Sequence, residues 1–131
     1  MKRILACFVL LLGLQPISYA HHSGTMFDYT KLVEIKGTVK EFQYTNPHSW
    51  FYIDVKDEAG NIAHWAFEAG TPSGMIRNGY KASVIKQGDV VTVTGFRAKD
   101  PSQNMAMLRE LTIADGTVFG LFGPQESPAA K

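Results

Sequence analysis

Two seven-residue runs separated by one short turn constrain the fold of this chain most strongly. The runs span residues 50–56 and 62–68, and the segment between them, DEAGN, is typical of a tight turn. Successive side chains of a strand point to opposite faces of a sheet, so each run predicts an apolar face and a mixed face. The apolar, core-facing set consists of Phe51, Ile53 and Val55 opposite Ala63, Trp65 and Phe67.

The other face of this predicted hairpin combines aromatic and ionisable side chains. Its members are Trp50, Tyr52 and Asp54, opposed by His64, Ala66 and Glu68. A slip of one residue would bury Asp54 and expose Phe51, so the pattern fixes the pairing parity. We therefore expect Trp65 in the core and His64 half-exposed near Asp54.

The remaining β-forming runs are predicted at residues 32–44, 90–96 and 105–113, with a bulge or bend at Gly37 in the first. Thr71 and Pro72 are typical of a helix start, and Gly79 of a helix end, so residues 72–78 predict a short helix. Three strands, a helix and two strands is the order of the OB fold. The sequence predicts a mainly all-β, five-stranded OB-like Greek-key barrel with one short helix between strands 3 and 4. A split barrel or small sandwich would fit the same strand list.

The first twenty residues have the pattern of a secretory signal peptide. Lys2 and Arg3 precede an apolar run at residues 4–14, which is shorter than the roughly 20 residues that span a bilayer. Ser18 and Ala20 are the small residues of a cleavage site, so cleavage is predicted after Ala20. We expect a signal peptide at 1–20, a barrel domain at 21–123 and a flexible tail at 124–131. The product would be exported and periplasmic, without stable membrane insertion.

Composition limits the function classes open to the exported part. Two of the 13 basic residues, Lys2 and Arg3, lie in the leader, which leaves 11 basic against 12 acidic residues. That balance argues against nucleic acid as a partner, since such proteins carry a basic face. The chain's one cysteine, Cys7, also lies in the leader, so the domain must be stable without disulfides.

The predicted new N-terminus, His21, suggests a metal site. Its free α-amine and its imidazole are both nitrogen donors near neutral pH. A third nitrogen would give a flat or T-shaped site that suits Cu(II), which heads the affinity order of divalent first-row metals. His48, on the Asn-Pro-His loop, is the first candidate for that nitrogen and His22 is the second. Glu68 would be an axial ligand or would orient a ligand histidine.

Other interpretations remain open at this stage. His21 and His22 would also fit a polar, disordered start, and His48 a hydrogen bond within its loop. Trp50, Tyr52 and His64 would alternatively bind a small ligand or an envelope protein partner. Met105 and Met107, at strand spacing, are interpreted as packing residues. The sequence has no glycine-flanked nucleophile or phosphate-binding loop, so carriage or buffering of a metal is favoured over catalysis.

Several motifs together resemble the DUF6152 family of small exported bacterial proteins. The segments that carry the resemblance are His21-His22-Ser23, Phe27-Asp28, Lys36-Gly37-Thr38-Val39, Asn46-Pro47-His48, Trp65 with Glu68, and residues 87–95. The resemblance implies a signal peptide and a compact β-barrel-like domain, and it supplies no activity. His64 is not part of the family pattern, and Pro101 stands where the family places glycine, which affects the loop between the last two predicted strands.

Overall fold

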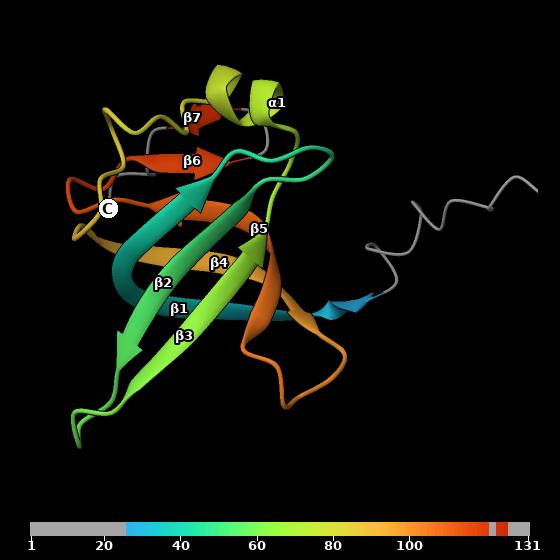
Figure 1. The fold of residues 1–131 in the computed structure, drawn as a ribbon, viewed down its shortest axis with the longest axis vertical. Helices are drawn as coiled ribbons and strands as arrows, with labels where there is room; N and C mark the ends of the chain where they lie inside the picture. Colours follow the sequence, from blue (N-terminus) through green and yellow to red (C-terminus); the bar gives the residue numbers. More distant parts are fainter. Residues whose placement is uncertain (1–25, 121–122, 126–131) are drawn as a thin grey trace, which may run out of the picture.

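The structure is a computed structural model, and it describes residues 26–120 and 123–125. The described elements, in chain order (Figure 1), are β1 (Phe27–Gln43), β2 (Trp50–Lys56), β3 (Ile62–Glu68), α1 (Pro72–Arg77), β4 (Val90–Ala98), β5 (Met105–Thr112), β6 (Val118–Gly120) and β7 (Gly123–Gln125). The predicted leader, His21, His22 and residues 126–131 of the predicted tail lie outside this range. Within it, no helix is both long and apolar enough to cross a membrane.

The strands form a closed barrel, which confirms the predicted OB-like Greek-key architecture. The strand order is β3-β2-β1-β4-β5, and β3 pairs with β5 to close the ring. This closing pair is parallel and joins residues 66–68 to residues 105–107, whereas the other barrel pairs are antiparallel. Helix α1 connects β3 to β4 and lies at one end of the barrel (Figure 1).

The register of the β2–β3 hairpin is the predicted one. Ile53 pairs with Trp65 and Asp54 with His64, so the two apolar faces match across the hairpin. The inward side chains form the centre of the core, and burial of each large one contributes about 1.5–3 kcal/mol. The fully enclosed aromatic and aliphatic members include Phe51, Ile53, Phe67, Val93, Leu111 and Ala106.

Strand β1 is longer than predicted. It begins at Phe27, where the expected strand began at residue 32, because Phe27 pairs with Ala98 and is buried. A register shift between Phe27 and Leu32 separates this first contact from the regular ladder with β4. The extension carries Asp28 and Tyr29 along the barrel as part of the sheet.

A bulge or bend was expected at Gly37, but the irregular pairing between β1 and β2 lies elsewhere. The register with β2 shifts between Val39 and Glu41, two to four residues later. At Gly37 itself a Cβ atom would lie 2.8 Å from the carbonyl oxygen of Asp54. Glycine is therefore needed at this position for the close approach of β1 to β2.

Helix α1 has the predicted start and N-cap, and it ends at Arg77, one residue before the predicted end at residue 78. The Thr71 hydroxyl accepts a hydrogen bond from the Gly74 N–H at 3.3 Å, and Pro72 occupies the first helical position. The chain leaves the helix through Gly79, which has a φ of 89°. Met75 is the buried residue of the helix and packs into the core cluster.

Candidate functional site

The loop between β1 and β2 is fastened to the end of β3. The Ser49 N–H donates to the carbonyl of Gly70, and the Ala69 N–H donates to the carbonyl of Ser49, both at 2.8 Å. These two bonds continue the β2–β3 ladder beyond the pair of Trp50 with Glu68. The preceding residue, His48, is held further by the Thr45 hydroxyl, which donates to its carbonyl at 2.7 Å. The ladder therefore brings His48 beside the last residue of β3.

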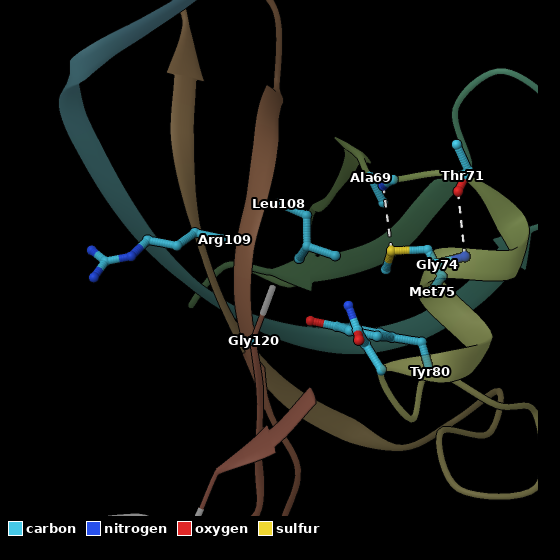
Figure 2. A pocket seen from close by; sticks show the side chains of 10 residues that line it. Ala69, Thr71, Gly74, Met75, Tyr80, Leu108, Arg109 and Gly120 are labelled. Carbon is cyan, nitrogen blue, oxygen red and sulfur yellow. Dashed lines mark hydrogen bonds between the residues drawn. The ribbon is translucent and has the colours of Figure 1, made fainter. Parts of the chain in front are cut away.

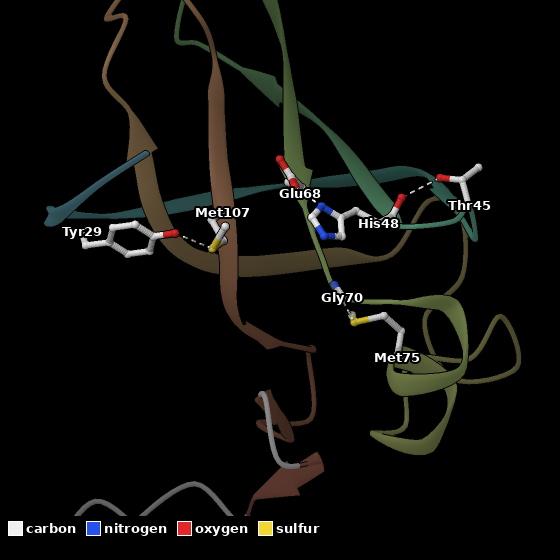
Figure 3. A network of polar contacts seen from close by, with 7 residues as sticks. All are labelled: Tyr29, Thr45, His48, Glu68, Gly70, Met75 and Met107. Atoms are coloured by element: carbon white, nitrogen blue, oxygen red, sulfur yellow. Dashed lines mark hydrogen bonds and ion pairs between the residues drawn. The ribbon is translucent and has the colours of Figure 1, made fainter. Parts of the chain in front are cut away.

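Glu68 is a buried carboxylate on the outward face of the barrel, and its side chain is only 4 % exposed. Its neighbours across the sheet, Trp50 on β2 and Met107 on β5, flank it on both sides. A buried carboxylate is costly unless it is paired. The partner is His48, whose Nδ1 contacts Glu68 Oε1 (Figure 3).

This pairing fixes the role of each ring nitrogen of His48. An ionised carboxylate only accepts hydrogen bonds, so Nδ1 carries the proton that is donated to Glu68. The neutral ring then has its lone pair on Nε2, at the opposite end. The side chain of His48 is 38 % exposed, so solvent and solutes reach it. Carboxylate–histidine pairs of this kind orient metal-binding histidines in proteins.

Met107 and Tyr29 belong to the same surface. Met107 lies directly beside Glu68 in the parallel β3–β5 ladder, and the Tyr29 hydroxyl donates to its Sδ at 3.5 Å (Figure 3). From the sequence, Met107 is predicted to be a packing residue, and no pattern singles out Tyr29. The alternation within residues 105–112 indicates that Met107 faces outward. Its position beside Glu68 depends on the long-range pairing of β5 with β3, for which the sequence contains no local signal.

Trp50, Tyr52 and His64 lie on the outer face of the hairpin, as predicted. The rings of Trp50 and Tyr52 stack with centroids 6.5 Å apart, and His64 Nδ1 lies 2.6 Å from Asp54 Oδ1. His64 precedes Glu68 by four residues, about 13 Å along a strand, so it is remote from the His48–Glu68 pair. A shallow groove at this second position is lined by Lys40, Glu41, Gln43, Tyr52, Ile53, Asp54 and His64.

A separate cavity of about 230 Å³ lies between α1 and the neighbouring strands, at the end of the barrel that α1 covers (Figure 2). Met75, Tyr80 and Leu108 form much of its wall. The Tyr80 hydroxyl donates to the Phe119 carbonyl at 2.6 Å, and the guanidinium of Arg109 points away from the space (Figure 2). None of the predicted site residues lines this cavity.

The structure thus brings together two of the four predicted metal-site residues, His48 and Glu68. The other two, His21 and His22, lie outside the described range. Among residues 26–120 and 123–125, no group of three or more His, Cys, Asp or Glu side chains is arranged to hold a metal ion. A complete site at His48 therefore needs further donors.

Comparison with known proteins gives a family match. The model of DUF6152, described as a family of unknown function, matches residues 10–106. That range contains His21, His22, the His48 loop and Glu68. No curated protein and no solved structure matches the chain. These comparisons supply no activity that could be transferred to the His48–Glu68 pair.

Proposed function

The chain belongs to the DUF6152 family of unknown function, and we propose that it is an exported, periplasmic copper-binding protein. Its ligands are the α-amine and ring of His21, exposed by cleavage after Ala20, together with Nε2 of His48. Its role is to carry or buffer copper rather than to catalyse a reaction.

The buried Glu68–His48 pair is the observation that carries this proposal. If His48 only formed hydrogen bonds within its own loop, it would not need to contact a carboxylate whose side chain is only 4 % exposed. Holding Nδ1 by a carboxylate fixes the tautomer and the orientation of the ring, so that the lone pair of Nε2 is available to a metal ion. Glu68 therefore takes the orienting role rather than the axial one.

The distance from the start of β1 supports participation of His21. Tyr29 contacts Met107 on β5, and β3 with Glu68 is the next strand. The path over β4 and β5 to β3 is three strand spacings, roughly 14 Å at about 4.8 Å each. His21 precedes Met26 by five residues, which span up to about 17 Å when extended. A chain that begins at His21 is therefore long enough to reach β3, the strand that carries Glu68.

Three nitrogen donors favour copper over the other divalent metals. Cu(II) accepts flat and tetragonal nitrogen sites and binds them more tightly than the other divalent first-row ions do. Zinc would favour a fourth ligand in a tetrahedral arrangement. The described residues around His48 offer a carboxylate that is already paired, so a three-nitrogen copper site is the simpler solution.

Cu(II) titration of two proteins that differ only at the N-terminus tests the proposal. One begins at His21, and the other has a single alanine before it. We expect the first to bind one Cu(II) with nitrogen ligands seen by electron paramagnetic resonance. The second should bind at least about tenfold more weakly, which corresponds to about 1.4 kcal/mol. Equal affinity of the two proteins would remove the terminal amine from the site.

His48→Ala and His22→Ala form the matched pair for the third nitrogen. If His48 is the ligand, His48→Ala weakens Cu(II) binding and His22→Ala leaves it near the wild-type affinity. The reverse order would assign the third nitrogen to His22 and would remove His48 from the site.

The groove beside His64 supports a second candidate function, the binding of a small ligand or an envelope protein. Its polar wall includes Tyr52, Asp54 and His64, and the stacked Trp50 ring adjoins it. In that case Tyr52→Ala abolishes the interaction and His21→Ala has no effect on it. Crosslinking of the exported protein in cells, with each variant compared, distinguishes this function from copper binding.

A further inference from the structure

We propose that the cavity between α1 and β5 binds a small uncharged aromatic molecule (Figure 2). None of the residues assigned to copper is among the described residues that line this cavity. The inference is therefore independent of the proposed copper function. It gives the barrel a second binding site, at the end that α1 covers (Figure 1).

The cavity has a buried apolar interior and a more exposed edge. Met75, Tyr80 and Leu108 line the interior, and all three are buried. Gly70 and Thr71 are exposed lining residues at the point where the chain enters α1. An aromatic ring in the cavity would contact the three buried side chains, while a small polar substituent could stay in contact with water at the edge.

The polar groups of the interior wall already have partners within the protein. The Tyr80 hydroxyl donates to the Phe119 carbonyl at 2.6 Å, and the Met75 Sδ accepts a hydrogen bond from the Gly70 N–H at 3.3 Å. The guanidinium of Arg109 points away from the space (Figure 2). A charged ligand would lose its hydration here without a compensating partner, and such a loss is costly. The wall therefore favours an uncharged, mainly apolar ligand.

The volume of the cavity sets the size of this ligand. An apolar protein cavity of about 150 Å³ binds benzene, whereas sites for drug-sized ligands begin at about 300 Å³. The cavity, at about 230 Å³, lies between these two sizes. It therefore fits one aromatic ring with one or two small substituents.

Two side chains of the wall favour an aromatic ring over an aliphatic ring of equal size. The thioether of Met75 lies in the wall, and sulfur makes favourable contacts with the edges of aromatic rings. The Tyr80 side chain adds an aromatic partner, and aromatic rings attract one another in tilted and offset arrangements. Tyr80 already packs in this way against Phe119, with ring centroids 5.7 Å apart.

Ala69 is the position at which the cavity can be filled by substitution. Its short, half-buried side chain lies in the wall, so leucine at this position would occupy part of the space. Ala66, three residues earlier, is also half-buried but pairs with Tyr52 and Met105 and does not line the cavity. Ala66→Leu is therefore a matched control for Ala69→Leu.

The test is a titration of the protein, labelled at its methionine methyl groups, with p-cresol, followed by nuclear magnetic resonance. We expect the methyl signal of Met75 to shift, because the aromatic probe lies against it, and the signals of Met26 and Met105 to stay in place. Ala69→Leu should weaken p-cresol binding at least about tenfold, or by about 1.4 kcal/mol, and Ala66→Leu should leave it unchanged. The aliphatic analogue 4-methylcyclohexanol should bind more weakly than p-cresol.

Each part of the inference has its own contrary result. No shift of the Met75 signal at saturating p-cresol would overturn the site, and this measurement uses the wild type, so it does not depend on the folding of a variant. Equal affinity of Ala69→Leu and Ala66→Leu would place the probe elsewhere and would also overturn it. Binding of 4-methylcyclohexanol as tight as that of p-cresol would contradict the preference for an aromatic ring. None of these results depends on copper binding.

Discussion

Replacing His48 by alanine should destabilise the metal-free protein, because it leaves the Glu68 carboxylate buried without its partner. Loss of one member of a fully buried pair costs about 3–5 kcal/mol. Here the Glu68 side chain is 4 % exposed but the His48 ring is 38 % exposed, so water can reach the gap that alanine leaves. We therefore expect about 2 kcal/mol, near the value of a hydrogen bond to a charged group. In a domain of this size that lowers Tm by about 8–16 °C.

Urea denaturation followed by circular dichroism measures this loss, with a chelator present to exclude metal. His64→Ala is the control, because the contact of His64 with Asp54 is exposed and should contribute less than about 1 kcal/mol. Glu68→Leu combined with His48→Ala removes the buried charge as well, so the double variant should be more stable than His48→Ala. An effect of His48→Ala no larger than that of His64→Ala would refute the reasoning that the pair is buried and coupled.

Further predictions concern the barrel that holds the pair. Gly37→Ala places a Cβ 2.8 Å from the Asp54 carbonyl oxygen and should cost about 1–3 kcal/mol in urea denaturation, whereas Gly70→Ala, with 3.4 Å to the nearest atom, should cost less. Burial raises the pKa of Tyr80 above its ordinary value of 10.0, so the folded state keeps a proton that the unfolded state loses. Stability should be intact below pH 10 and should fall as the pH rises above it. Tyr80→Phe should remove most of that slope while losing the hydrogen bond to Phe119, about 1 kcal/mol at neutral pH. An unchanged slope in Tyr80→Phe would assign it to other groups.

The hairpin was predictable because its information is local. Residues 50–56 and 62–68 alternate with a period of two about a five-residue turn, and β2 and β3 have those bounds in the structure. The helix start at Thr71 and Pro72 was equally local. By contrast, β1 begins at Phe27 rather than at residue 32 because of pairing with Ala98, 71 positions away in the sequence.

The sequence could indicate residues of the candidate site, but not that they lie together. The sequence singled out His48 and Glu68 separately, but nothing local indicates that the loop is tied back onto the end of β3 through Ser49. The neighbourhood of Met107 depends on the parallel β3–β5 pairing that closes the barrel. Such contacts arise when the barrel closes. The pattern of a single strand indicates which side chains face the core, but it does not indicate which strand will lie beside it.

Pulsed electron paramagnetic resonance of the Cu(II)-loaded protein beginning at His21 tests the central claim most directly. It detects the remote nitrogen of each coordinated imidazole, which for His48 is the Nδ1 held by Glu68. We predict that His48→Gln lowers the modulation from that of two imidazoles to that of one, while His64→Gln leaves it unchanged. Modulation in His48→Gln equal to that of the wild type would contradict coordination of copper by His48.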